Sequence, residues 1–103
     1  MTKVYYIMAY DKKEISAPEF KKWLKDVAEP AWRKIPGVKS VKTFHRKAGL
    51  GQRPVYQTWW EIPNFAFLDV LMEKSASPEM DKIMTKFYDS VSVFDASIVH
   101  QLE

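Results

Sequence analysis

Histidine is the side chain type that titrates nearest neutral pH, so the two histidines of this sequence are the first candidates for proton transfer. His45 stands in an extended stretch at 38–48, and His100 stands near the end of another at 93–102. Either could act as a general base. The pair does not have metal-ligand spacing and the chain has no cysteine, so we expect no metal, thiol or disulfide chemistry. A structural or surface role for each histidine is the alternative interpretation.

Two tyrosines form the second set of candidates. Tyr6 and Tyr10 share one parity of the extended stretch at 4–10. Their hydroxyls could hydrogen-bond a substrate oxygen, which makes Tyr6 a further proton-handling candidate and Tyr10 a substrate-binding candidate. Paired tyrosines on a strand also occur without any such role.

Adjacent indoles form the third set. Trp59 and Trp60 lie side by side in the stretch at 55–62, so a strand there would put one indole on each face. We expect one indole to pack in a subunit interface and the other, Trp60, to form a stacking wall for a ligand. Trp23, on the apolar face of a predicted helix, is a further substrate-binding candidate. Core filling is the alternative for these residues.

Strands and helices must position these side chains. The helix predicted over 17–34 begins with Ser16 and Glu19 at capping-box spacing and carries an apolar stripe with a period near 3.6 residues. Pro30 lies inside that pattern and should kink or divide the helix. A second helical region follows at 64–91. Apolar, β-branched and aromatic runs predict strands at 4–10, 38–48, 55–62 and 93–102, the first of them buried on both faces at the centre of its sheet.

The resulting order is β-α-β-β-α-β. It predicts an α+β fold of the ferredoxin-like type, with a four-stranded antiparallel sheet and two helices on one face, in a single domain over 1–103. The other face of the sheet would then be apolar and uncovered. We therefore expect a homodimer joined sheet to sheet, a dimeric α/β barrel.

Composition excludes several classes of protein. No apolar run approaches a membrane span and the N-terminal run is too short and tyrosine-rich for a signal peptide, so we expect a soluble cytoplasmic protein. Between Pro30 and Trp60 lie seven Lys and Arg residues and no acid, a basic stretch that either steers an anion or is a solvated strand surface. The third strand lacks the aromatic signature of RNA-recognition domains, so nucleic-acid binding ranks below small-molecule binding.

Three segments carry a resemblance to a known family. The sequences EFKKWLKDVAEPAWRKIPGVKSVKTFH, TWWEIPN and SASPEMDKIMTKFYDSVSVF resemble the EthD-type branch of the dimeric α/β-barrel superfamily. The resemblance implies a homodimer of ferredoxin-like units, each with a cleft between sheet and helices. Such clefts take varied small molecules, often aromatic or polyketide-like.

One position departs from that family. Its helix histidine falls on Ala28 of the segment Val27-Ala28-Glu29-Pro30, and the neighbouring Glu29 is expected to point about 100° away around a regular helix. A second branch of the superfamily, the haem-degrading monooxygenases, uses an Asn, a Trp and a haem-ligating His. Of these three, Trp60 alone has a counterpart here, so we expect no haem and no other cofactor.

The leading hypothesis is a small protein that binds a hydrophobic or aromatic molecule in a sheet–helix cleft. Whether it is an enzyme stays open. If it is one, the resemblance favours cofactor-free monooxygenation, isomerisation or cyclisation, with Tyr6, His45 or His100 handling the proton. The alternative is a non-catalytic interaction module whose basic stretch meets an anionic partner such as nucleic acid.

Overall fold

The computed structural model describes residues 2–49 and 54–102, in which four strands form one antiparallel sheet. The strands are β1 (Val4–Lys12), β2 (Ser40–His45), β3 (Tyr56–Ile62) and β4 (Val91–His100), in the spatial order β2-β3-β1-β4. β1 pairs with β3 on one side and with β4 on the other. The central position predicted for the first strand is therefore confirmed.

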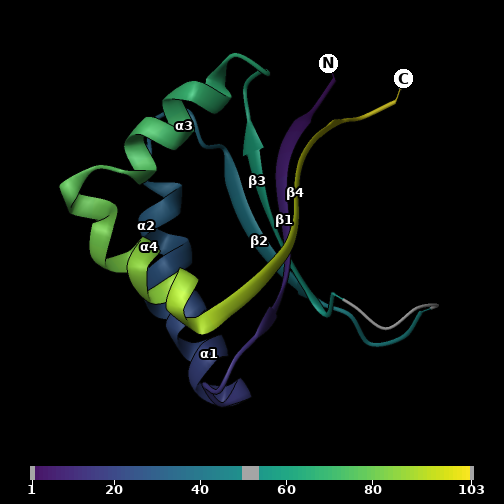
Figure 1. Ribbon diagram of the computed structural model, residues 1–103. Coiled ribbons are helices and arrows are strands. Elements are labelled where there is room, and N and C mark those ends of the chain that lie inside the picture. Colours follow the sequence, from purple (N-terminus) through teal and green to yellow (C-terminus); the bar gives the residue numbers. More distant parts are fainter. Residues whose placement is uncertain (1, 50–53, 103) are drawn as a thin grey trace.

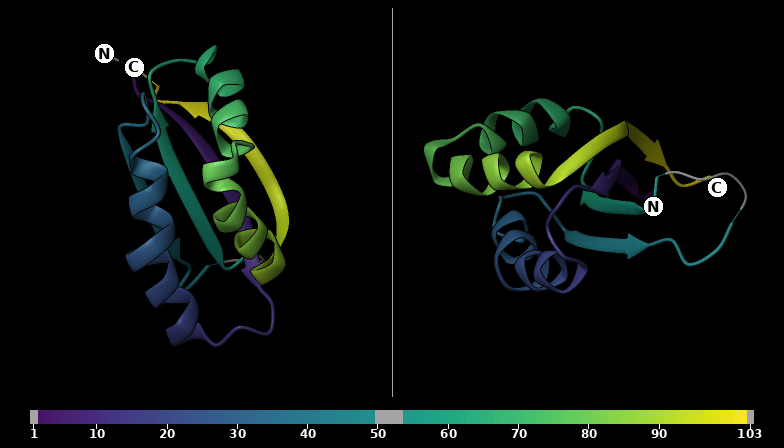
Figure 2. Two further views of the ribbon diagram at one scale, coloured as in Figure 1. Left: turned by 90° about the vertical axis from the view of Figure 1, so that its left-hand side faces the viewer. Right: turned by 60° about the horizontal axis from the view of Figure 1, so that its bottom comes forward.

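Two helical arms cover one face of this sheet, and the other face carries no helix (Figure 1, Figure 2). The first arm consists of α1 (Ala17–Trp23), a π-helical turn η1 (Leu24–Ala28) and α2 (Glu29–Arg33). The second consists of α3 (Phe67–Ser75) and α4 (Pro78–Ser90). Within 2–49 and 54–102, no helix has the length and apolar character needed to cross a bilayer.

The predicted start of the first arm is confirmed. Ser16 is the N-cap of α1, and its hydroxyl accepts a hydrogen bond from the backbone N–H of Glu19 at 3.3 Å. This contact satisfies one of the amide groups that a helix start leaves without an intrahelical acceptor.

Pro30 divides the first arm, as predicted, and it does so by a wide turn. In a regular helix the proline ring would collide with the carbonyl of Asp26 and could not hydrogen-bond to it. The chain instead widens into η1, where the N–H of Glu29 donates to the carbonyl of Leu24, five residues earlier. Ala28 and Glu29, which follow from this turn in the chain, are both completely buried. The expected separation of about 100° between the directions of Ala28 and Glu29 stays a prediction.

Aromatic rings fill the layer between the arms and the sheet. Trp32 lies edge-on to Trp60 of β3 at 5.0 Å between ring centroids and to Phe87 of α4 at 5.3 Å. Phe87 in turn lies edge-on to Tyr10 of β1 at 5.1 Å. Edge-to-face pairs of this kind stabilise by about 1 kcal/mol beyond their buried area. The two arms and the sheet are thus joined through one aromatic cluster.

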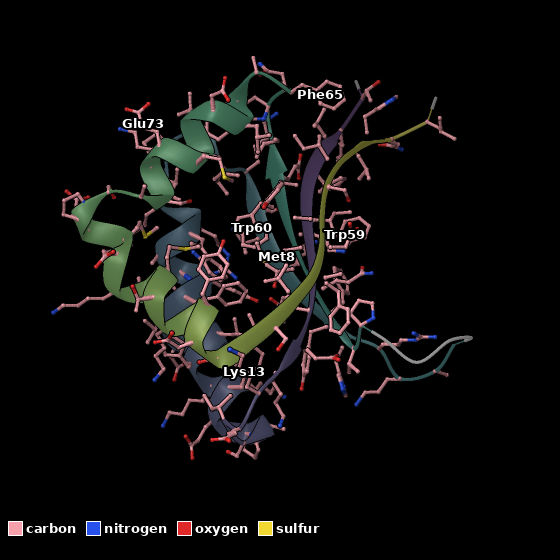
Figure 3. The ribbon with its side chains drawn as sticks, in the orientation of Figure 1. Met8, Lys13, Trp59, Trp60, Phe65 and Glu73 are labelled. Atoms are coloured by element: carbon pink, nitrogen blue, oxygen red, sulfur yellow. The ribbon has the colours of Figure 1, made fainter. Side chains whose placement is uncertain are left out.

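The adjacent indoles of β3 point to opposite faces, as predicted. Trp60 is directed toward the helices and Trp59 away from them (Figure 3). On the uncovered face, Trp59 contacts Tyr5 at 5.2 Å and Phe44 at 5.7 Å between ring centroids. An aromatic row therefore crosses three strands on the face without helices.

Candidate functional site

A cavity of about 40 Å³ lies between the second helical arm and the centre of the sheet. Its buried inner wall includes Trp32 and Trp60, whereas Met72 and Tyr88 are 42% and 47% exposed and form its outer rim. Among the described residues, the cavity is lined by Tyr6, Met8, Trp32, Trp60, Leu71, Met72, Ser75, Met84 and Tyr88. Most of these side chains are aromatic or methionine, so the cavity suits an apolar molecule with a flat surface.

Tyr6 supplies a polar group to this cavity. It pairs with Trp60 across β1 and β3, and the two rings lie 5.4 Å apart. Burial raises the pKa of Tyr6 above its ordinary value, and the nearby Tyr88 raises it further. Burial also raises the pKa of Tyr88. Both phenols therefore keep their protons at neutral pH and can donate hydrogen bonds to a bound molecule.

A chain of hydroxyls lies next to the cavity along the same face of the sheet. The hydroxyl of Tyr10 is 2.8 Å from Oγ1 of Thr58, which is 2.9 Å from Oγ1 of Thr43. Burial raises the pKa of Tyr10 to about 12; the hydrogen bonds of Thr58 and Thr43 oppose this effect, and the charge of Glu29 adds to it. Tyr10 thus belongs to a buried polar cluster and is held neutral.

Glu29 is a buried carboxylate whose charge acts on Tyr10 of this cluster. Its Oε1 accepts hydrogen bonds from Nη2 of Arg33 at 2.9 Å and from Nζ of Lys25 at 3.3 Å. Those two basic side chains are about half exposed and approach from the solvent side. The other oxygen, Oε2, is buried and has no hydrogen-bond partner among the described residues. A fully buried carboxylate therefore keeps one acceptor atom unused in the interior.

The structure does not bring the two histidines together. His45 pairs with Tyr56 near one end of the sheet and stacks on its ring at 4.8 Å. His100 pairs with Val4 near the other end and contacts Phe65 at 5.9 Å. Both are exposed, and neither lines the cavity between the sheet and the second arm.

The aromatic candidates divide between the cavity and its surroundings. Tyr6 and Trp60 line it together. Tyr10 is completely buried beyond it in the hydroxyl cluster. Trp23 is half-buried on the first arm, where Nζ of Lys86 lies 5.6 Å from its ring, and it does not line the cavity.

Sequence reasoning missed Glu29 and the contribution of the second arm. The i, i+4 spacing of Lys25, Glu29 and Arg33 was a usable signal for a shared ion pair. Met72 and Met84 belong to the predicted apolar stripe of the second helical region, which indicated a place in the core and no contact with a cavity. For Tyr88 there was no signal, because its contact with the cavity depends on how the arm lies on the sheet.

The comparisons with known proteins concern the whole chain. No protein-family model matches the sequence, and no curated protein matches it. Among solved structures, HapK from Hahella chejuensis is similar with a TM-score of 0.74 and 18% identity, over 96% of this chain and 92% of that one. An ethyl tert-butyl ether D (EthD) family protein from Bacillus halodurans has a TM-score of 0.68 and 18% identity, over 97% and 99% of the two chains.

A third solved structure is a dimeric protein of unknown function with a ferredoxin-like fold, from Bacteroides fragilis. It has a TM-score of 0.59 and 13% identity, over 96% of this chain and 94% of that one. The fold is ferredoxin-like. At these identities the likeness concerns the fold alone, and it agrees with the strand order and the helical layer described above. Within 2–49 and 54–102, no group of three or more His, Asp or Glu side chains could hold a metal ion.

The raised pKa of Tyr10 gives a testable dependence of stability on pH. The unfolded tyrosine ionises near pH 10 and the folded one near 12, so the stabilisation is complete below about pH 10 and is lost as the pH rises toward 12. Between about pH 9 and about pH 11, the free energy of unfolding of the wild type should fall by about 1.4 kcal/mol more than that of Tyr10→Phe. Urea denaturation measures both. Parallel losses in the two proteins would contradict this assignment.

Proposed function

We propose that this chain is a small-molecule-binding protein whose ligand lies in the cavity between the sheet and the second helical arm. The observation that carries the proposal is the composition of that cavity. Trp32 and Trp60 provide a buried aromatic wall, and Tyr6 provides a hydroxyl on the same surface. A mostly apolar lining with a few placed polar groups is typical of small-molecule sites. The ligand class that fits is a small hydrophobic or aromatic compound.

Ligand entry requires the lining to move. A volume of about 40 Å³ is close to that of one water molecule, roughly 30 Å³, whereas ligand pockets usually exceed about 300 Å³. Met8, Met72 and Met84 have flexible side chains that can adopt other rotamers. Leu71 is the one buried residue of α3, so this helix has a limited contribution to the core. We infer that a ligand enters past Met72 and Tyr88, and that α3 shifts and the methionine side chains change rotamer as it enters.

If the protein is an enzyme, Tyr6 is the proton-handling residue that this site favours. Its ring centroid lies 5.4 Å from that of Trp60, and its raised pKa keeps it a hydrogen-bond donor at neutral pH. It would donate a hydrogen bond to a carbonyl or enolate oxygen of the ligand. His45 and His100 are exposed at opposite ends of the sheet, which does not favour a shared role at this cavity.

The uncovered face of the sheet supports a homodimer as part of the same proposal. Tyr5, Trp59 and Phe44 form a continuous aromatic row there, and Ile7 lies beside Trp59 in the register of β1 and β3. An apolar surface of this kind on a small soluble domain usually serves as an interface. A ferredoxin-like protein with a similar structure is described as dimeric. We infer that two copies join through these faces.

The basic stretch gives little support to a nucleic-acid partner. Arg33, within it, is paired with the buried carboxylate of Glu29. Lys42 lies opposite Trp59 on the uncovered face, where the dimer interface is proposed. The small-molecule site is therefore the better-supported function.

Filling the cavity should weaken ligand binding. Ser75 lines it and is partly exposed, so Ser75→Phe places a ring in the ligand space with little change to the core. We expect the affinity for β-naphthyl methyl ether, measured by quenching of tryptophan fluorescence, to fall at least about tenfold. Ala76→Phe adds the same ring at the exposed neighbouring position and should bind like the wild type. Unchanged binding by Ser75→Phe, or no binding by the wild type, would contradict the proposed site.

A charge on the uncovered face should separate the subunits. In sedimentation velocity the wild type should have twice the mass of one chain, whereas Ile7→Lys should be a monomer because two desolvated ammonium groups would meet in the interface. Val70→Lys, at a 40% exposed position on α3, is the matched control and should remain a dimer. A monomeric wild type would rule out the proposed interface.

A further inference from the structure

We propose that Glu29 is the polar recognition group of the ligand site, and that its Oε2 accepts a hydrogen bond from a neutral hydroxyl of the bound molecule. The ligand class is then a phenol or an enol whose apolar body occupies the cavity. This inference rests on the proposed function, since it names which molecules the same cavity prefers. It starts from a buried carboxylate oxygen that has no partner among the described residues.

The polar cluster lies one step along the sheet from the cavity. On β1, Tyr10 follows the lining residue Met8 by two positions, and on β3, Thr58 precedes the lining residue Trp60 by two positions. Because β1 and β3 are antiparallel, both steps run toward the same end of the sheet, by about 7 Å.

Residues of the first helical arm are displaced in the same direction along the sheet. Glu29 precedes the lining residue Trp32 by three positions, a rise of about 4.5 Å along a helix. The arm runs from α1 at the end of the sheet where β1 finishes, so this step also leads toward Tyr10 and Thr58 (Figure 1). The charge of Glu29 contributes to the raised pKa of Tyr10, which agrees with their proximity. Glu29 does not itself line the cavity, so a ligand that meets it must extend beyond Met8 toward Tyr10 and Thr58.

The charges around Glu29 select the chemistry of the ligand. Arg33 and Lys25 already bind Oε1 from the solvent side, so a further cation is not needed for charge balance. An anionic ligand group would be repelled by the carboxylate at close range. A neutral O–H group satisfies the remaining acceptor without adding charge, and an acceptor left unsatisfied in the interior is costly.

The neighbouring hydroxyls can adapt to such a ligand. In the chain from Tyr10 through Thr58 to Thr43, either atom of each hydrogen bond can be the donor. The three hydroxyls hold three protons and use two between them, so the third proton remains available for the ligand oxygen. The site therefore offers a hydroxyl group both an acceptor, Oε2 of Glu29, and a donor.

Two probe molecules with the same aromatic body test this inference. β-Naphthol has the O–H group, and β-naphthyl methyl ether lacks it. We expect the wild type to bind β-naphthol about tenfold more tightly, because a hydrogen bond to a buried charged acceptor is lost with the ether. In Glu29→Met the two affinities should become equal, while binding of the ether should persist. Glu73→Gln, at an exposed position of α3, should keep the tenfold preference.

The emission of β-naphthol gives a second readout that does not depend on affinity. This compound becomes a strong acid on excitation and emits at longer wavelength when its proton passes to a neighbouring base. The bound probe should show this emission in the wild type and lose it in Glu29→Gln, which retains the side-chain shape. Lys25 and Arg33 can turn into solvent in that variant, so the fold should be kept.

The outcomes separate the two proposals. If neither probe binds the wild type, or Ser75→Phe binds both normally, the proposed site itself is wrong. If both probes bind the cavity with equal affinity in the wild type, or the emission is unchanged in Glu29→Gln, the cavity stands and the role of Glu29 is overturned.

Discussion

Pro30 has no backbone N–H, so it cannot donate the hydrogen bond that a helix needs at that position. The packing of the interior depends on the helical geometry that the first arm adopts there. The arm widens into the π-helical turn Leu24–Ala28, after which Glu29 and Trp32 both face inward. One proline thus sets which side chains of the arm meet the sheet.

Two layers of different chemistry follow from this arrangement. Trp32 joins Trp60 and Phe87 in an aromatic cluster, and the cavity lies against that cluster. The charge of Glu29 raises the pKa of Tyr10, which lies two residues beyond the cavity-lining Met8 on β1. Burying a carboxylate costs several kcal/mol, which Arg33 and Lys25 offset only at Oε1. An interior that keeps an unused charged acceptor is less stable than an apolar one, and such groups are typical of sites that bind or react.

Much of the fold was predictable from the sequence because strand alternation and helix caps are local signals. The central first strand, the division at Pro30 and the opposite directions of Trp59 and Trp60 all follow from residue types within a few positions. The candidate site was less predictable, because side-chain parity gives the face of a strand but not the position along the sheet. His45 and His100 illustrate this limit: both are strand residues, yet the register puts them at opposite ends. The burial of Glu29 had no signal in the sequence, since a charged side chain is almost never fully buried unless it is paired.

The four tryptophans report directly on whether a ligand enters between the sheet and the second arm. Trp32 and Trp60 line the cavity, Trp59 lies on the uncovered face and Trp23 on the first arm. The measurement is a heteronuclear NMR titration of nitrogen-labelled protein with β-naphthyl methyl ether, following the four indole N–H signals. A ligand in this cavity should shift the signals of Trp32 and Trp60 and leave those of Trp23 and Trp59 in place. Shifts confined to Trp59 or Trp23 would contradict it.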